Sequence, residues 1–388
     1  MKHKLTYRSI KEASLGGKRV IVRTDFDVAF RDGKIDEDFR IRANVETLQL
    51  ILHSGGRVRM ITHRGRPEGR KQAALSIRPI ATHLSRLLRR SVVVVDNPFD
   101  ESAYIRHDDS SDILIFENIR FWPGEEKNDV LFERWLAKWG DLYVNEAFAS
   151  SHRSHASMTA LARLLPAYAG LHLMKEVGCL SSIFENPERP IVAILGGAKL
   201  ETKLPLIRRF LKEADYVLIG GALANTLFSL RGFTVGKSVA DHNVVMPKAM
   251  FSNKKLYLPS DVVATRTLKS DSGIRRTEAD HVSPDEYIVD IGPKTIRIFS
   301  DIAAKAGTIV WNGPLGYVEE KKSAEGTRKF AQAVAKMKAF KVVGGGDSIA
   351  VLSRYKLLRH FSFVSTGGGA MLEFLAGKKL PGLEALKK

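Results

Sequence analysis

The chain has 388 residues, of which 44% are hydrophobic and 27% are charged, and its formal net charge at pH 7 is +18. This length is too great for one ordinary hydrophobic core and favours two domains, and the composition excludes a largely disordered protein. The single cysteine, Cys179, excludes an internal disulfide and a cysteine metal cluster, and it favours a reducing compartment such as the cytoplasm.

The net positive charge makes a nucleic-acid-binding protein one alternative. The basic excess is spread over both halves of the chain, with one local concentration between Arg57 and Arg90, where Glu68 is the sole acidic residue. No aromatic residue lies in that stretch, although single-strand binders stack bases on aromatic rings. The most apolar later run, Tyr216–Leu230, is interrupted by Asn225 and Thr226. We therefore expect neither a specific nucleic-acid partner nor a membrane segment.

The first half of the chain alternates short apolar runs with amphipathic stretches. This pattern predicts helices around residues 41–52 and 77–90, and strands at Arg19–Arg23, Val58–Thr62, Val92–Val95, Ile113–Phe116 and Leu142–Val144. Strands that alternate with helices indicate a parallel sheet covered on both faces. Such sheets bind their ligands at the carboxyl ends of the strands.

Charged and histidine side chains follow these predicted strands and would lie along one rim of the sheet. They are Arg23, Asp25, Asp27, Arg40, His63, Arg66, Arg120, His152 and Arg153. An arginine fork matches carboxylate and phosphate oxygens, so the set predicts a site for a small, multiply anionic molecule. The alternative for each arginine is a solvated or paired side chain at the start of a loop. The histidines lack a carboxylate or cysteine at metal-ligand spacing, so we favour hydrogen-bonding roles for them.

An apolar run, Ile191–Leu195, stops at Gly196-Gly197 and is followed by a polar stretch with helical spacing. We interpret this as strand, glycine turn and helix. Backbone amides that are free at a helix start favour an anion, and two glycines let a phosphate approach them. Lys199 and Lys203 are four residues apart, which would place them on one helix face. The alternative is an ordinary turn with two solvated lysines.

A helix around residues 173–184, followed by prolines, marks a change of domain. After it the unit of strand, glycine turn and helix recurs at residues 219–226, 311–316, 343–348 and 365–370. Several such turns at one sheet edge would cradle a nucleotide and its phosphates. Asp347 is the predicted magnesium ligand, because Mg²⁺ binds through one or two carboxylates plus phosphate oxygens. The segment Gly232–Ser238 is not a Walker A loop, because its glycines are too closely spaced.

The chain resembles the phosphoglycerate kinase family over nearly its full length. The resemblance is carried, in the family's order, by RVIVRTDF, DEDFRIRA, THRGRP, FENIRF, VNEAF, HRSHAS, ENPERPIVAILGGAK, WNGPLG, VGGGDS and STGGGAMLEFLAGKKLPG. It implies an α/β fold of two similar-sized, doubly wound parallel-sheet domains joined by a helix and hinge. The expected segments are a first domain at 1–172, a linker at 173–190, a second domain at 191–376, and a tail at 377–388 that returns to the first domain.

The resemblance also implies an activity: reversible phosphoryl transfer from 1,3-bisphosphoglycerate to Mg-ADP, which gives 3-phosphoglycerate and ATP. We expect a cytoplasmic monomer whose cleft closes by hinge bending. The rim residues would bind 3-phosphoglycerate, and Asp347 would bind Mg²⁺. The residues implied in nucleotide binding are Gly197, Lys199, Lys203, Gly220, Gly221, Asn312, Glu319, Gly345, Gly346, Asp347 and Ser348. Those implied in catalysis are Arg40, Lys199, Lys203, Gly346 and Gly369.

Four residues depart from the family's pattern: Asp27 replaces asparagine, Ala29 proline, Arg64 leucine and Thr202 aspartate. We hypothesise that Arg64 neutralises Asp27, because an aspartate beside an anionic substrate is unfavourable by ~4 kcal/mol at about 4 Å for an effective dielectric constant near 20. The alternative is that the two departures are unrelated. Because Asp27 belongs to the substrate site, a kinase-like scaffold without activity is a further alternative to an active enzyme.

Overall fold

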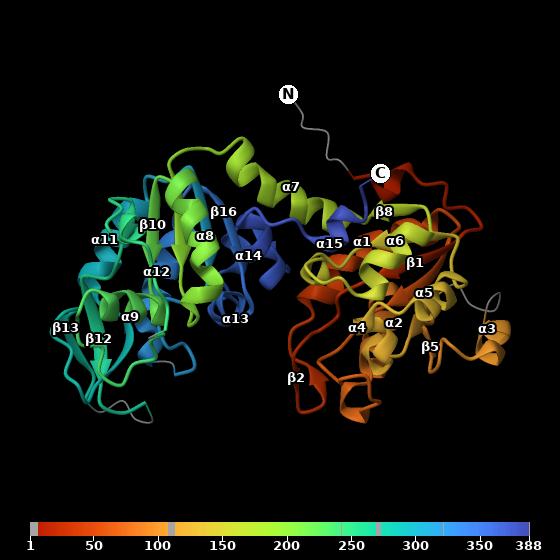
Figure 1. Cartoon of the computed structure of the whole chain (residues 1–388), viewed down its shortest axis with the longest axis horizontal. Helices are drawn as coiled ribbons and strands as arrows, with labels where there is room; N and C mark the ends of the chain where they lie inside the picture. The colour runs from red at the N-terminus through yellow and green to blue at the C-terminus, as the bar shows by residue number, and fades with distance from the viewer. Residues whose placement is uncertain (1–6, 108–112, 242, 269–272, 321, 388) are drawn as a thin grey trace. The chain divides into compact units, whose positions relative to one another are not determined.

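The structure is a computed structural model that describes residues 7–107, 113–241, 243–268, 273–320 and 322–387. These residues form two compact units (Figure 1). The first unit contains the chain up to Gly178 together with the residues from Lys379 onward, and the second contains Cys179–Lys378. Helix α7 (Leu171–Glu185) carries the chain from one unit into the other. None of the described helices has the length and apolar character that crossing a membrane requires.

The described part of the first unit is built on six parallel strands in the order β5-β6-β4-β1-β7-β8. The strands are β1 (Arg19–Arg23), β4 (Arg57–Ile61), β5 (Val93–Val95), β6 (Ile113–Phe116), β7 (Leu142–Asn145) and β8 (Ala167–Ala169). The helices are α1 (Phe39–His53), α2 (Arg78–Leu88), α3 (Glu101–His107), α4 (Pro123–Lys127), α5 (Val130–Ala137), α6 (Leu161–Leu164) and α15 (Pro381–Glu384). The predicted strands are found within a residue at each end, whereas β8 was not predicted.

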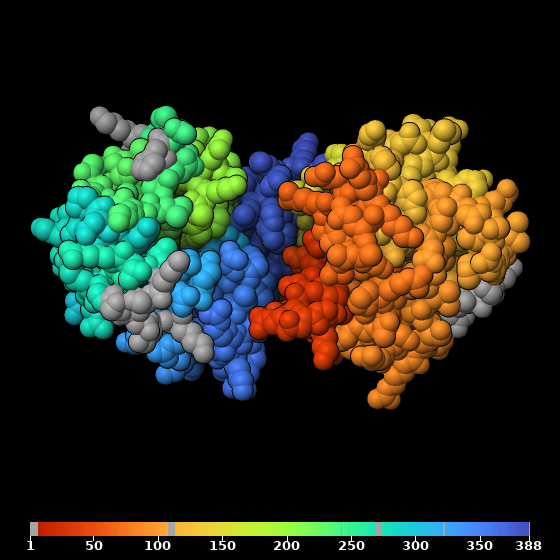
Figure 2. Space-filling view, turned by 90° about the horizontal axis from the view of Figure 1, so that it is seen from below, coloured from red at the N-terminus to blue at the C-terminus, as the bar shows by residue number. Residues whose placement is uncertain are grey.

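The core of the first unit explains why these runs become strands and helices. Val20 and Val22 of β1 pack in one buried cluster with Ile41 of α1 and Leu84 of α2. The residue between the two valines, Ile21, is also fully buried, on the other face of the strand. A strand that is buried on both faces needs a continuous apolar run, as in parallel sheets covered by helices. Figure 2 shows each unit closely packed in space-filling form.

The described part of the second unit also has a six-stranded parallel sheet, in the order β11-β10-β9-β15-β16-β17. Its strands are β9 (Ile191–Leu195), β10 (Tyr216–Ile219), β11 (Leu256–Tyr257), β15 (Thr308–Asn312), β16 (Phe340–Gly344) and β17 (Phe363–Ser365). Its helices are α8 (Leu200–Glu213), α9 (Gly221–Leu230), α10 (Lys248–Phe251), α11 (Pro293–Ala303), α12 (Glu325–Lys336), α13 (Gly346–Arg354) and α14 (Gly369–Leu375).

Two small antiparallel sheets depart from the predicted doubly wound pattern. In the second unit, β12 (Asp261–Thr265) pairs with β13 (Arg275–Glu278) and β14 (Tyr287–Ile291). In the first unit, β2 (Phe30–Arg31) and β3 (Lys34–Ile35) form a short hairpin. Both additions matter for the sites, because the hairpin carries a contact of Arg64 and β14 forms part of a cavity wall.

The register of the parallel strands places their carboxyl ends side by side. In the first unit Arg23, the last residue of β1, is in register with Ile61 of β4 and Asn145 of β7. In the second unit Asn312, the last residue of β15, is in register with the last residues of β9 and β16, Leu195 and Gly344. The loops after these strands therefore start from one sheet edge in each unit.

Candidate active site

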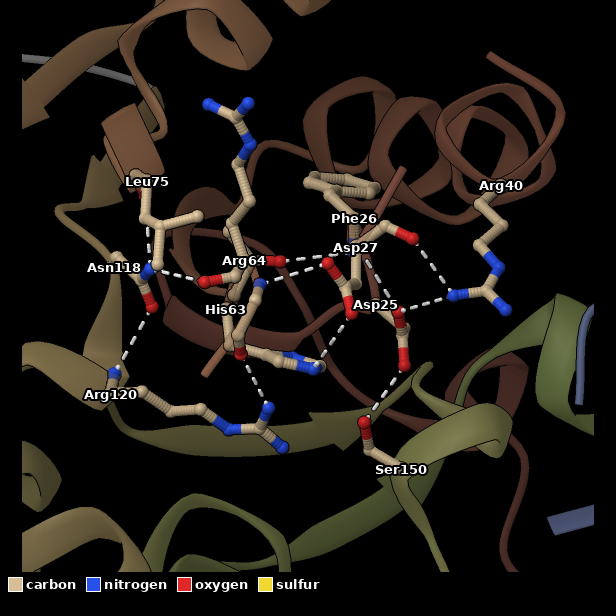
Figure 3. A network of polar contacts seen from close by, with 12 residues as sticks. Asp25, Phe26, Asp27, Arg40, His63, Arg64, Leu75, Asn118, Arg120 and Ser150 are labelled. Atoms are coloured by element: carbon tan, nitrogen blue, oxygen red, sulfur yellow. Dashed lines mark hydrogen bonds and ion pairs between the residues drawn. The ribbon is translucent and has the colours of Figure 1, made fainter. Parts of the chain in front are cut away.

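In the first unit, a buried arginine and a buried histidine, Arg23 and His63, form the centre of the predicted rim. Figure 3 shows His63 among its polar neighbours. Arg23 Nε donates to Ser157 Oγ at 2.7 Å, and Arg23 Nη2 lies 3.3 Å from His63 Nδ1. Burial holds the pKa of His63 well below its usual range; Asp25 opposes this effect, while Arg23 and Arg120 add to it. His63 is therefore neutral at pH 7.

Asp25 joins the first strand's loop to helix α1. Its Oδ1 accepts from Arg40 Nη1 at 3.3 Å and its Oδ2 accepts from Ser150 Oγ at 2.8 Å. Burial alone would raise the pKa of this carboxyl, but the neighbouring positive groups, His63 when protonated, Arg40 and Arg23, hold it below its usual range. Arg40 Nη1 also donates to the backbone oxygen of Asp27 at 3.0 Å. Asp25 thus fixes the guanidinium group of Arg40 at the rim.

Arg120 adds a buried guanidinium group to the same rim, and not all of its N–H groups have hydrogen-bond acceptors among the described residues. Its Nη1 donates to the backbone oxygen of Gly65 at 2.8 Å, and its Nε lies 3.5 Å from Glu126 Oε1. Among the described residues, Arg120 Nη2 has no hydrogen-bond partner although it is buried. Burial, Arg23 and Arg153 together lower the pKa of Arg120 to about 10. A guanidinium group in this position favours an anionic ligand.

The other predicted rim residues lie further from this network. Arg66 is exposed on the loop after β4. His152 and Arg153 are half-buried on the loop after β7, close enough to add their charge to the electrostatic field at His155. Burial, with Arg120 and Arg23, lowers the pKa of His155 to about 3. Direct contacts therefore link Arg23 to His63, His63 to Asp27, and Arg40 to Asp25 and Asp27. Arg120 lies close enough for Arg23 to affect its pKa, and Arg66 is at the exposed edge.

The second unit contains a cavity of about 290 Å³ beside its glycine turns. Four predicted nucleotide-binding residues line it: Gly197, Gly221, Glu319 and Asp347. Much of the remaining wall is apolar and comes from α9, β14 and the loop after β15. A mainly apolar cavity with a few polar groups at its edge is typical of a cofactor or nucleotide site.

Hydrogen bonds from Asn312 and Ser348 hold the glycine turns together. Asn312 Nδ2 donates to the backbone oxygen of Gly344 at 2.9 Å, and the Asn312 backbone oxygen accepts from the N–H of Gly196 at 2.9 Å. Ser348 Oγ accepts from the N–H of Gly313 at 2.7 Å. These contacts position three neighbouring loops, those after β9, β15 and β16. We therefore assign Asn312 and Ser348 a positioning role.

The two predicted lysines do not share one helix face as expected. Helix α8 begins at Leu200, so Lys199 is its exposed N-cap residue, whereas Lys203 lies within the helix and is 8% exposed. Lys203 Nζ donates to the backbone oxygens of Gly196 and Asn312. Burial lowers the pKa of Lys203 to about 8, although Asp347 opposes the shift. Lys203 is thus the buried cation beneath the first glycine turn.

One expectation for the turns stays a prediction and one is wrong. The N–H groups of Gly196 and Gly197 donate to the backbone oxygens of Asn312 and Pro314 at 2.9 and 3.1 Å, so the predicted anion would have to use the amides at the start of α8. The expected helix directly after the turn at residues 311–316 is wrong, since the chain continues irregularly to Glu320. The other turns do precede helices, and Gly346 and Gly369 begin α13 and α14.

Comparison with known proteins agrees with this arrangement. The family model for phosphoglycerate kinase matches residues 10–378. The chain belongs to the phosphoglycerate kinase family. It is similar to the phosphoglycerate kinase of Desulfosudis oleivorans, at 40% identity over 391 residues covering 98% of this chain and 99% of the relative. The corresponding enzyme of Moorella thermoacetica is 40% identical over 388 residues, covering 97% and 98%.

Solved phosphoglycerate kinase structures also match both units of the fold. The structure from Coxiella burnetii has a TM-score of 0.83 at 36% identity, and that from Pyrococcus horikoshii has a TM-score of 0.85 at 32% identity. Each covers 98% of this chain and 98% of the matched chain. As a member of the phosphoglycerate kinase family, the chain is a phosphotransferase of glycolysis.

The pairing hypothesis expects a direct hydrogen bond or ion pair between Arg64 and the family departure Asp27, and the structure gives none between these described side chains. Burial lowers the pKa of Arg64, and the charge of Asp27 opposes this shift, so an electrostatic attraction without contact remains. Figure 3 shows the Arg64 guanidinium group pointing away from Asp27. Arg64 instead stacks on the ring of Phe30, 3.5 Å from its centroid, and its Nη1 donates to the backbone oxygen of Ser76 at 3.1 Å. Asp27 Oδ1 accepts from the N–H of Gly65 at 2.9 Å, and its Oδ2 lies 3.9 Å from His63 Nε2. A backbone amide and a histidine thus contact the Asp27 carboxylate.

Sequence reasoning missed buried residues that hydrogen-bond to the rim side chains and hold them in place. Ser157 Oγ accepts from Arg23 and donates to Glu125 Oε1 at 2.6 Å. Glu125 is fully buried, and burial raises its pKa although Arg23 opposes the shift. Ser150 likewise supports Asp25. The one available signal was Glu125 itself, a charged residue shortly after the aromatic segment FENIRF, in the helix α4 that Pro123 begins.

Proposed function

We propose that the first unit binds 3-phosphoglycerate or 1,3-bisphosphoglycerate and that the second binds Mg-ADP or Mg-ATP. The observation that carries the acid site is the buried Nη2 of Arg120, which has no hydrogen-bond partner among the described residues. Arg23 and Arg153 lower the pKa of Arg120, so positive charge at this rim exceeds what nearby carboxylates neutralise. An anionic acid with a phosphate supplies the missing charge and acceptors.

Two features support the nucleotide site: the cavity, and the charged side chains of Asp347 and Lys203 close to it. The exposed carboxylate of Asp347 stands at the first turn of α13, where it lines the cavity. No group of three or more His, Cys, Asp or Glu residues in the described ranges is arranged to hold a metal. A single carboxylate fits Mg²⁺ when nucleotide phosphates complete the coordination, and the ion would neutralise phosphate charge. Lys203 places a positive charge beneath the glycine turn at Gly196, close enough to Asp347 for that carboxylate to raise its pKa against the effect of burial.

The reaction then needs positioning and charge more than acid–base chemistry. The attacking group is the carboxylate of 3-phosphoglycerate, which is already ionised at neutral pH, so no general base is required. We assign charge stabilisation of the transferred phosphoryl group to Arg40, Lys199 and Lys203, and to the helix starts at Gly346 and Gly369. His63 is neutral and is a hydrogen-bonding residue in this scheme.

We assign the remaining nucleotide contacts by position. Gly220 and Gly221 begin α9 at the cavity and would face the adenine, Glu319 would bind the ribose, and Gly345 would face the phosphates. Because the two sets of residues belong to different units, we propose that a hinge movement accompanies catalysis. We also propose a cytoplasmic monomer without a nucleic-acid partner. The single cysteine and the spread of basic residues over both units support these assignments.

Two variants test the assignment of one ligand to each unit, because each should weaken the binding of a different ligand. In Arg120→Gln, the affinity for 3-phosphoglycerate should fall at least about tenfold while that for ADP stays the same, because one charged hydrogen-bond donor is lost. In Asp347→Asn, the affinity for Mg-ADP should fall and that for 3-phosphoglycerate should not. Isothermal titration calorimetry of the full chain measures both. If either variant weakens both ligands equally, the two sites are not separate as proposed.

A further inference from the structure

A buried carboxylate at the end of β7 has no role in the scheme above. Glu146 directly follows this strand and is 1% exposed. Its Oε1 accepts from the backbone N–H of His172 at 3.0 Å, and its Oε2 accepts from that of Leu173 at 2.9 Å. Both N–H groups belong to the first turn of α7, where the helix itself offers them no acceptor. Glu146 therefore caps the helix that carries the chain from one unit into the other.

A threonine of α1 completes this cap. Thr47 Oγ1 accepts from the N–H of Leu171 at 3.0 Å and donates to Glu146 Oε1. Thr47 and Glu146 are both buried. The same helix α1 carries Arg40 in its first turn. One carboxylate thus connects the end of β7, the helix of Arg40 and the start of α7.

Interactions with α7 offset part of the cost of burying this carboxylate. Burial raises the pKa of Glu146, while the charge of His172 and the hydrogen bond from Thr47 oppose this shift. A negative charge at a helix start also interacts favourably with the helix dipole. His172 Nε2 lies 3.4 Å from Glu176 Oε1, one turn further along α7. Buried polar contacts therefore hold the beginning of α7 to the first unit, and breaking one of them is costly.

A second buried carboxylate caps a helix in a similar way, but inside one unit. Asp261 Oδ1 accepts from the N–H and the hydroxyl group of Thr295, each at 2.7 Å, and its Oδ2 accepts from the N–H of Lys294 at 3.0 Å. These residues lie in the first turn of α11, which belongs wholly to the second unit. The two caps share a carboxylate and a threonine, and they differ in the helix that they hold.

We propose that Glu146 and Thr47 are positioning residues that fix the start of α7 to the acid-binding unit and so guide the hinge movement. Helix α7 has 15 residues and is about 22 Å long, so a loose first turn changes the direction in which the chain enters the second unit. Phosphoryl transfer is sensitive to small displacements of the reacting groups. Neither residue is among the proposed ligand contacts, so their loss acts on turnover rather than on binding. The inference rests on the proposed function and adds the anchor of its hinge helix.

Glu146→Gln and Thr47→Val test the proposal in the full chain, because each removes one part of the cap. Both variants should lose at least about tenfold in kcat, as expected when reacting groups are misplaced. Dissociation constants for 3-phosphoglycerate alone and for Mg-ATP alone, measured by calorimetry, should stay within about twofold of wild type, because ground-state binding is kept. Hydrogen exchange of the amides at residues 171–173 should become at least about tenfold faster, as expected for one lost hydrogen bond.

Thr47→Ser and Asp261→Asn are the controls. Serine keeps the hydroxyl group that joins α1 to the cap, and Asp261→Asn weakens the matched cap of α11. Both variants should keep kcat within about twofold of wild type, because neither releases the start of α7. The kcat values of all variants are compared at saturating substrates.

Three results would overturn the proposal. The first is a folded Thr47→Val with wild-type kcat, which decides the matter even where Glu146→Gln fails to fold. The second is a loss of affinity for 3-phosphoglycerate alone that equals the loss in kcat. The third is an equal loss of kcat in Asp261→Asn. In each case the proposed function stands if the wild type transfers the phosphoryl group, whereas a wild type without turnover contradicts the function itself.

Discussion

Arg23 Nη2 lies 3.3 Å from His63 Nδ1, and both side chains are buried. A guanidinium group can only donate, so Nδ1 must accept, and the ring proton belongs on Nε2. Nε2 lies 3.9 Å from the carboxylate of Asp27. The contact therefore selects one neutral tautomer of His63 and holds the hydrogen-bonding pattern of the rim.

This tautomer predicts that His63 does not titrate in the usual histidine range. Burial and the charges of Arg23, Arg120 and Arg153 lower its pKa, so protonation requires pH values well below ~6.5, where an ordinary histidine gains its proton. Long-range ¹H–¹⁵N NMR spectra of the ring should show a protonated Nε2 and an unprotonated Nδ1 at about pH 6.5, where an ordinary histidine is half protonated. A His63 titration midpoint near pH 6.5 would show that the Arg23 contact does not control the ring.

The lowered pKa of Lys203 predicts that activity declines at alkaline pH. Burial lowers its pKa to about 8, so the ammonium charge beneath the glycine turn at Gly196 is present below that pH and is lost above it. The value of kcat/KM for the nucleotide, which reports groups of the free enzyme, should therefore fall above about pH 8. Lys203→Arg should move the decline to higher pH, and Lys199→Arg, at an exposed position, should not. An identical pH profile for Lys203→Arg contradicts this role.

Asp347 predicts the magnesium dependence of the reaction. In Asp347→Ala the nucleotide phosphates must hold the ion without a protein carboxylate, so half-maximal activity should require more Mg²⁺. The KM for 3-phosphoglycerate should stay near the wild-type value, because its proposed site lies in the other unit. Magnesium titrations of kcat measure the shift. Superimposed titration curves of mutant and wild type would indicate a purely structural role for Asp347.

The separate partners of Asp27 and Arg64 predict that their substitutions act independently. Asp27→Asn keeps an oxygen for the N–H of Gly65, and Arg64→Leu removes the stacking on Phe30. In a double-mutant cycle on 3-phosphoglycerate binding, the two effects should add within ~0.5 kcal/mol. A larger coupling, with Asp27→Asn rescuing Arg64→Leu, would restore the ion-pair hypothesis.

The parallel sheets could be predicted because strands buried on both faces are continuous apolar runs. Ile113–Phe116 and Ile191–Leu195 have the bounds that their sequences predict. The antiparallel sheet of the second unit could not be predicted in the same way. Its strand Arg275–Glu278 is largely exposed and polar, so no hydrophobic pattern marks it. Its pairing with β12 and β14 arises from tertiary structure.

The members of the rim could be predicted, but their partners could not. Arg23 is the last residue of a strand, His63 and Arg120 follow strands, and parallel strands end at one edge. The partner of Arg64 depends on Phe30 in a hairpin whose two-residue strands give no sequence pattern. Glu125 supports Arg23 through Ser157, across a sequence separation that no local pattern reveals.

The central claim is that an active kinase uses Arg40 to stabilise the phosphoryl group during transfer. The most direct measurement is a coupled assay of ATP-dependent 3-phosphoglycerate phosphorylation, with wild type and Arg40→Ala compared at saturating substrates. Wild type should turn over, and Arg40→Ala should lose ~100–1000-fold in kcat with a much smaller change in KM. A wild type without activity, or a variant that keeps more than about half of the wild-type kcat where a loss of that size is expected, would contradict the account.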